Sequence, residues 1–305
     1  MNHRPHTPAD DHLFAAIAAW ANESREFPVE ETDGTVYLPE LKRTSYAMNP
    51  AILCSALFGI AKRKSEDADG KKIFIRRNLA CTFKTTNGAT IEYRGMELGQ
   101  VDLTVLMGLL NKHQGMATSC AIEFAPSTFC AQLGWSDSDH NKFRLKECLL
   151  RLRGAFLIIR AVKKADDVEK SKLARAIGSG WTVGFISDFT FDGESPWSVK
   201  FDERIGQLFG TPSTYLIASK HKALTAGLQT WLYGYIAANT CTYAVSLQTL
   251  HDASGSTSPL NEFARQVRDA LPRLVEIGVV DTHSTVKNGK VAIFKVFSSA
   301  RPKRK

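Results

Sequence analysis

The sequence predicts an α+β fold made of two tandem winged-helix domains, in each of which a helix-turn-helix is followed by a β-hairpin wing. Three observations lead to this prediction. Residues 243–297 read in order as a strand, a helix, a turn glycine, a long helix and a strand pair, and a similar order starts at residue 122. The 305-residue chain is also basic, with a net charge of +8. A repeated unit of this kind with positive charge is typical of DNA-binding proteins.

The clearest helix of the chain starts near Ser258, runs to about Gly278 and has one apolar face. Its apolar residues recur at the 3.6-residue spacing of an α-helix and are Leu260, Phe263, Val267, Leu271, Leu274 and Ile277. A helical wheel gives the opposite face as Ser258, Asn261, Arg265 and Asp269, with Arg268 at its margin. We expect Pro272 to kink or end the regular helix near Arg268, because proline lacks the backbone donor that a helix uses.

The elements around this helix complete a predicted second domain over residues 213–298. Residues 243–246 form a strand, residues 247–254 a helix, and Gly255-Ser256 the turn. Lys287-Asn288-Gly289-Lys290 closes the wing hairpin, because Asn-Gly favours two-residue hairpin turns. A further helix is expected over residues 220–239, with a buried stripe of Leu224, Leu228, Trp231 and Tyr235.

The first domain, predicted over residues 46–212, repeats the same order. Residues 122–134 and 243–255 are both 13 residues long, and each reads as strand, helix and turn glycine. A helix over residues 139–153 follows, and its buried face is Leu145, Cys148, Leu149 and Leu152. We expect the strand at 155–164 to pair with residues 181–191 as the wing of this domain.

The remaining segments are assigned from local signals. Residues 1–45 are predicted as an N-terminal arm, partly disordered, and residues 299–305 as a basic tail. Thr86-Asn87-Gly88 indicates a hairpin between 79–84 and 89–93, while residues 100–112 form a helix and 197–201 a strand. The basic clusters at 62–64, 71–72 and 76–77 fit either a solvated loop or a binding surface, and the sequence leaves both open.

Composition and motifs exclude several classes of protein. The pI near 9.2 favours an acidic partner such as nucleic acid. The sequence has no GxxxxGK[ST] loop and no HxH, HExxH or HxxxH spacing, so we expect no catalytic residue, no cofactor and no metal. Six dispersed cysteines without a CxxC pair are typical of reduced thiols in the cytoplasm. No apolar run is long enough to span a membrane.

Eight side chains are predicted to contact DNA. They are Ser258, Asn261, Arg265 and Arg268 on the second recognition helix, Lys287 and Lys290 beside its wing tip, and Lys142 and Lys146 in the first domain. Arg265 is the expected principal base reader, because it lies in the amino-terminal half of its helix and arginine binds O6 and N7 of guanine together. Asn261, one turn earlier, could bind adenine in the same way. Two alternatives stay open for Arg265: it holds only a phosphate, or it simply faces solvent.

The motifs also resemble those of the TrfA-type plasmid replication initiators, which are related to initiators with paired winged helices. The matching stretches are SALF, YRGMELGQVDLTV, IEFAPSTFCAQLGWS with KECLLRLRGAFL, and YAVSLQTLHDASGS with FARQVRDA, between about residues 50 and 280. The resemblance implies binding to double-stranded origin DNA at directly repeated iterons, melting of an adjacent AT-rich segment into single strands, and exchange between dimers and monomers. It also implies contacts with the host replicative helicase, host initiator and sliding clamp. The chain departs from the family at Pro272, and Gln207-Leu208-Phe209 is only a fragment of a clamp-binding peptide.

Two other functions remain alternatives at this point. A winged-helix transcriptional repressor, including one that represses its own promoter, would share the DNA-binding elements but would usually need only one such domain. A DNA-nicking replication protein would need a nucleophile and metal ligands, and the histidine spacing does not favour it.

Overall fold

The computed structural model describes residues 44–61, 63–66, 72–84, 89–161, 181–192, 196–205, 214–239 and 243–296. The fold is mixed α+β, and within these residues the strands form six small sheets. Four predicted features lie outside the described residues: the N-terminal arm up to residue 43, the turn at Thr86-Asn87-Gly88, Gln207-Leu208-Phe209 and the basic tail.

The carboxyl-terminal part of the fold contains the elements that the sequence predicts. They are β14 (Tyr243–Ser246), α10 (Leu247–Ser254), α11 (Leu260–Glu276), β15 (Thr285–Lys287) and β16 (Lys290–Ile293). The three strands form one antiparallel sheet in the order β14-β16-β15. α11 continues past Pro272 to Glu276, so the expectation that this proline could end the helix is wrong. Ser258 precedes α11, whose N-cap is Pro259.

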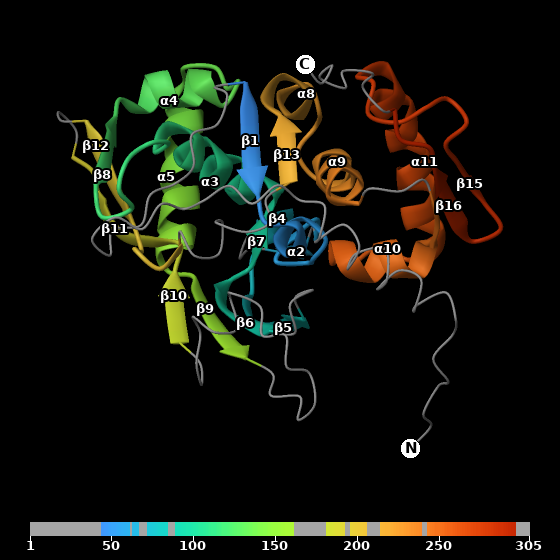
Figure 1. The fold of residues 1–305 in the computed structure, drawn as a ribbon, viewed down its shortest axis with the longest axis horizontal. Coiled ribbons are helices and arrows are strands. Elements are labelled where there is room, and N and C mark those ends of the chain that lie inside the picture. Colours follow the sequence, from blue (N-terminus) through green and yellow to red (C-terminus); the bar gives the residue numbers. More distant parts are fainter. Residues whose placement is uncertain are drawn as a thin grey trace, which may run out of the picture.

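A second group of elements has the same order earlier in the chain, except that two further strands come between its second helix and its hairpin. It consists of β8 (Ala121–Phe124), α4 (Pro126–Gln132), α5 (Asp139–Arg153), β11 (Ile186–Thr190) and β12 (Trp197–Phe201). The strand order β8-β12-β11 matches β14-β16-β15, because in both sheets the first strand pairs with the second strand of the later hairpin. The predicted buried face of α5 is confirmed. Figure 1 shows the two groups at opposite ends of the molecule.

The wing predicted for the first domain is partly wrong. β9 (Phe156–Ala161) does pair with β10 (Trp181–Gly184), but both belong to a separate sheet with the order β10-β9-β6-β5, formed with β5 (Asn78–Lys84) and β6 (Ala89–Met96). The hairpin on β8 is instead β11–β12. The predicted strand over residues 181–191 is split between the two sheets at Phe185. The Phe185 ring is fully buried, and its centre lies 5.7 Å from the centre of the Phe58 ring. Beyond it, Ser187 Oγ donates to the carbonyl oxygen of Phe201 (2.9 Å), which ties this segment to β12.

The amino-terminal elements connect the two groups. β1 (Ser45–Met48) pairs with β13 (Thr214–Ile217), and α2 (Pro50–Leu53) packs on α9 (Leu228–Ala238). β2 (Phe58–Gly59) runs parallel to β7 (Leu98–Gly99), and β3 (Arg63–Glu66) pairs with β4 (Lys72–Ile75). The predicted β5–β6 hairpin and the predicted helix α3 (Gln100–Lys112) are confirmed. β1 therefore pairs across the boundary predicted at residue 212.

The single helix predicted over residues 220–239 is wrong, because the structure has two helices there. α8 (Ala218–Lys222) and α9 are separated by Gly227, whose φ of 128° lies outside the helical region. The Gly227 amide donates to Thr230 Oγ1 (3.1 Å), which starts α9 at residue 228. Of the predicted stripe, Leu224, Trp231 and Tyr235 are buried, whereas Leu228 is only partly buried.

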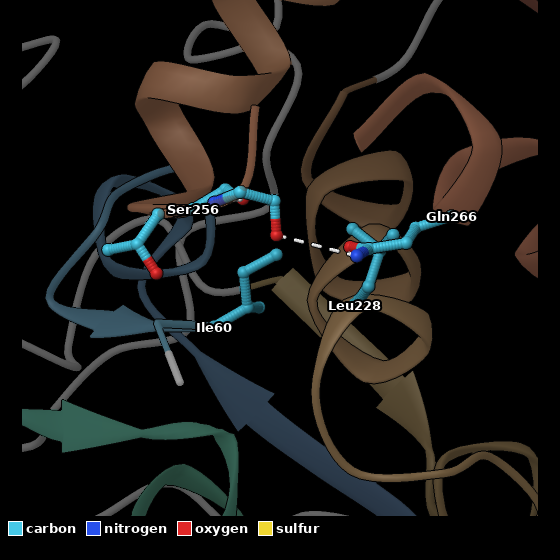
Figure 2. A pocket seen from close by; sticks show the side chains of 6 residues that line it. Ile60, Leu228, Ser256 and Gln266 are labelled. Carbon is cyan, nitrogen blue, oxygen red and sulfur yellow. Dashed lines mark hydrogen bonds between the residues drawn. The ribbon is translucent and has the colours of Figure 1, made fainter. Parts of the chain in front are cut away.

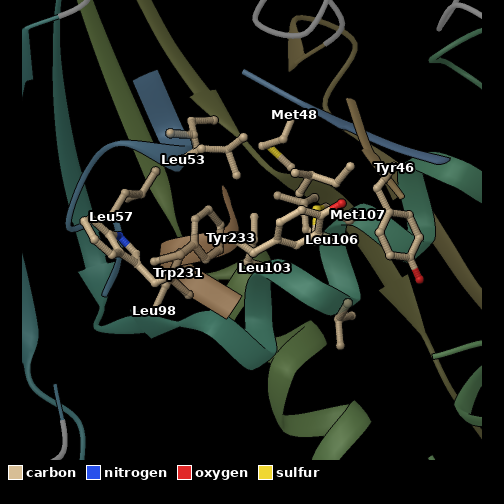
Figure 3. Close-up of a cluster of buried hydrophobic side chains, with 14 of the residues drawn as sticks. Tyr46, Met48, Leu53, Leu57, Leu98, Leu103, Leu106, Met107, Trp231 and Tyr233 are labelled. Atoms are coloured by element: carbon tan, nitrogen blue, oxygen red, sulfur yellow. The ribbon is translucent and has the colours of Figure 1, made fainter. Parts of the chain in front are cut away.

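The central core joins α9 to α3, β1 and α2. Figure 3 shows Trp231 and Tyr233 among apolar side chains from these elements, including Met48, Leu53 and Leu103. The Trp231 indole Nε1 also donates to the carbonyl oxygen of Ser55 (3.3 Å), so the polar end of this buried ring is satisfied. Because α9 also packs on α11, this core connects α11 to the rest of the molecule.

Candidate nucleic-acid interface

The turn between α10 and α11 is held by its backbone and by His251. Gly255 has a φ of 66°, and a Cβ at this position would lie only 3.0 Å from Ala56 Cβ, so both the backbone conformation and the close approach favour glycine. His251 Nε2 donates to the carbonyl oxygen of Ser258 (2.7 Å), and its ring meets the ring of Phe263 edge-on at 5.2 Å. These contacts fix the direction in which α11 leaves the turn.

The exposed face of α11 carries the predicted residues Asn261, Arg265 and Arg268. Two carboxylates hold the Arg265 guanidinium: Glu262 Oε1 lies 2.6 Å from Nη2, and Asp269 Oδ2 lies 2.8 Å from Nη1. Hydrogen bonds from Arg265 and Gln266 lower the pKa of the Glu262 carboxyl to about 2, so this carboxylate is ionised at neutral pH. Any base or phosphate that Arg265 binds must therefore compete with these two carboxylates.

Ser258 lies in the turn rather than on the exposed helix face. Its Oγ accepts a hydrogen bond from Gln266 Nε2 (3.4 Å), which is the dashed line from Gln266 in Figure 2. Both residues line a cavity of ≈ 130 Å³, together with Ile60, Leu228, Ser256 and Thr257. The helical wheel misplaced Ser258 because it assumed helical geometry from Ser258 onward, whereas α11 begins two residues later.

The β15–β16 hairpin presents two lysines at its tip. Lys287 and Lys290 are opposite each other in register, and both are exposed. Asn288 and Gly289 between them have φ values of 51° and 70°, as the predicted two-residue turn requires. Among the residues that the structure describes, no carboxylate lies within ion-pair distance of Lys287, Lys290 or Arg268. These three cations are therefore available to contact phosphates.

The cations of α5 are held differently. The Lys142 ammonium lies 2.9 Å from Asp137 and 3.8 Å from Asp139, and its contacts with Asp137 raise its pKa. The Lys146 ammonium lies 3.9 Å from the centre of the Phe191 ring. The sequence prediction overlooked Phe143, whose side chain is 63% exposed on the same helix.

Comparison with known proteins then decides the family. The family model described as TrfA protein matches residues 38–293. The chain belongs to the TrfA family. Two crystal structures of domains 2 and 3 of RctB are similar to it, with TM-scores of 0.48 and 0.47 and identities of 12% and 11%. They cover 82% and 78% of this chain, and 99% and 95% of their own chains are matched. No curated protein matches the chain.

Membership of the TrfA family supports a role in replication initiation and, with it, a DNA-binding role. In the described part of this TrfA-family chain, no three His, Cys, Asp or Glu side chains gather as a metal site would require. No helix in the same residues is long and apolar enough to cross a membrane.

Proposed function

We propose that this TrfA-family protein is a plasmid replication initiator that binds directly repeated iterons at a replication origin through two winged helices. One observation supports this proposal above all: a helix pair followed by an antiparallel hairpin occurs twice, with the equivalent strand orders β8-β12-β11 and β14-β16-β15. In this proposal α5 and α11 are the recognition helices, since the second helix of such a motif enters the major groove. The proposed domains remain residues 46–212 and 213–298.

The proposal extends to the steps that follow binding. The protein promotes melting of adjacent AT-rich DNA, contacts the resulting single strand, and recruits the host replicative helicase with the host initiator and sliding clamp. It exchanges between dimers and monomers and acts in the cytoplasm, and it needs no cofactor, metal or catalytic residue of its own.

Hydroxyl-radical footprinting of the full-length protein on its parent replicon tests this function. Two recognition helices in successive major grooves lie about 10 bp apart, so one protein should protect about two helical turns on one side of the duplex. Lys146→Glu should weaken protection in one turn and Arg268→Glu in the other, because these residues lie on α5 and α11. Lys112→Glu, at the end of α3, makes the same charge change outside both helices and serves as the control.

The pattern of protected sites also separates the other functions. Several directly repeated sites support an initiator, a single palindromic operator supports a repressor, and a specific nick indicates a nicking enzyme. Protection of only one turn, weakened alike by both glutamate substitutions, would contradict the proposed use of two recognition helices.

Arg265→Ala should weaken binding to the cognate repeat selectively. A bidentate arginine–guanine contact is worth roughly 1–3 kcal/mol of discrimination, so we expect roughly 5- to 150-fold weaker binding to the repeat. Binding to a scrambled duplex at the same salt concentration should change far less. Equilibrium titration of both duplexes with both proteins measures this difference, and changing the contacted guanine should abolish it.

Two variants on the same helix control this test. Arg268→Ala removes an exposed arginine that has no carboxylate partner among the described residues, and it should weaken both duplexes alike, as loss of a phosphate contact does. Glu262→Gln removes one of the carboxylates that compete for Arg265 and should tighten binding. Equal losses of the two duplexes in Arg265→Ala would reduce Arg265 to a phosphate contact.

A further inference from the structure

The buried faces of α5 and α11 put the two helices in a common register. The four buried residues of α5, Leu145, Cys148, Leu149 and Leu152, have the same spacing as the last four of the six on α11, Val267, Ala270, Leu271 and Leu274. When these faces are aligned, Phe143 takes the position of Arg265, and Lys146 takes the position of Arg268. In the first proposed winged-helix domain, the residue at the position of the predicted base reader is therefore the aromatic Phe143.

Phe143 is exposed to solvent, whereas the cations beside it on α5 already have partners. Its side chain is 63% exposed, the largest exposure among the large apolar side chains described. The cations beside it are engaged, because Lys142 pairs with Asp137 and the Arg144 guanidinium lies 4.6 Å from the centre of the Trp135 ring. Phe143 also lies in the amino-terminal third of α5, the part that a recognition helix presents to base edges.

We propose that Phe143 contacts the 5-methyl group of a thymine in the major groove, so that the first unit recognises an A·T pair by apolar contact. This inference rests on the proposed function, since it requires α5 to enter the groove. The thymine methyl group is the apolar group that base edges offer in the major groove, and phenylalanine is among the side chains that contact it. A phenyl ring cannot donate a hydrogen bond to guanine or to phosphate, so the contact would distinguish bases and add no general affinity.

Uracil interference with the full-length protein tests this contact. A duplex is first selected from a random library by the protein, and its thymines are then replaced singly by deoxyuridine, which lacks only the methyl group. The wild-type protein should bind roughly fourfold more weakly when the contacted methyl group is missing, the value for one apolar carbon kept from water. Phe143→Ala should bind the thymine and uracil forms at that position equally.

Two comparison variants and a folding check make the test decisive. Phe143→Leu keeps an apolar side chain and should retain part of the preference for thymine. Leu150→Ala removes another exposed apolar side chain, 41% exposed in the carboxyl-terminal half of α5, and should leave the uracil pattern unchanged. Circular dichroism confirms that each variant is folded.

The possible results separate this inference from the proposed function. If Phe143→Ala selects the same duplex with the same uracil pattern as wild type, the inference is wrong while DNA binding stands, and the exposed ring then fits a protein partner instead. If the wild-type protein enriches no duplex at all, both the proposed function and the inference fail.

Discussion

Asp102→Ala should lower the free energy of unfolding by about 3–5 kcal/mol, the usual cost of removing one partner from a buried ion pair. The Asp102 side chain is fully buried in the first turn of α3. Its Oδ1 lies 2.8 Å from Arg151 Nη2, and its Oδ2 lies 3.1 Å from Arg76 Nη1. Because the Arg151 side chain is only 12% exposed, the substitution leaves a largely buried cation without its main partner.

The same carboxylate also caps α3. Asp102 Oδ2 accepts a hydrogen bond from the Gly99 amide (2.8 Å), and a negative charge at a helix amino terminus is favourable. Asp102→Asn can keep the cap but not the charge, so we expect it to lose less stability than Asp102→Ala. Since Arg151 belongs to the last turn of α5, the network also fixes a proposed recognition helix to α3.

Urea unfolding of the full-length protein at neutral pH measures this effect. Glu203→Ala breaks an exposed pair with Lys200 (3.9 Å) and should change stability by less than about 1 kcal/mol. Combining Asp102→Ala with Arg151→Met should recover part of the loss, because the stranded cation is then gone. Unfolding midpoints that coincide for Asp102→Ala and Glu203→Ala would show that the network does not stabilise the fold.

Local signals in the sequence were sufficient for much of the fold. α5, α10 and α11 were predicted within a few residues because their apolar spacing is helical, and the hairpins β5–β6 and β15–β16 because the sequence between each pair of strands contains Asn-Gly. The predictions that failed depended on distant contacts or on an unusual backbone conformation. Burial of Phe185 divides one predicted strand between two sheets, and Gly227 divides one predicted helix. No periodicity indicates that β1 pairs with β13, which lies more than 160 residues later in the chain.

The same distinction between local signals and distant contacts applies to the candidate site. The ion pairs of Arg265 are local, since Glu262 and Asp269 lie three residues before and four residues after it, and that spacing could have been recognised in the sequence. Phe143 could also have been found by aligning the two apolar stripes. By contrast, Asp102 joins Arg151 across 49 residues, and only the packing of α3 against α5 brings them together.

DNA binding should fall about 10³-fold or more between 50 and 200 mM salt. Each phosphate that a cation neutralises releases counterions, and about six such contacts give a decrease of this size. The predicted phosphate contacts include Lys142, Lys146, Arg268, Lys287 and Lys290, in a chain with a net charge of +8. Titrations of one duplex at several salt concentrations give the slope of log affinity against log salt. A slope near zero would exclude phosphate contacts as the main source of affinity.

The ion pairs in the structure predict that these cations contribute unequally to that slope. Lys290→Ala should reduce the slope by about one, because Lys290 is exposed and has no carboxylate partner in the part of the chain that the structure describes. Lys142→Ala should reduce it less, since Lys142 must first leave Asp137 and Asp139, whose charges then attract cations from solution. Removing those acids in Asp137→Asn with Asp139→Asn should restore a full contribution from Lys142.

Lys112→Ala, outside the proposed interface, should leave the slope unchanged. Equal reductions by Lys142→Ala, Lys290→Ala and Lys112→Ala would mean that net charge, rather than these individual contacts, controls binding.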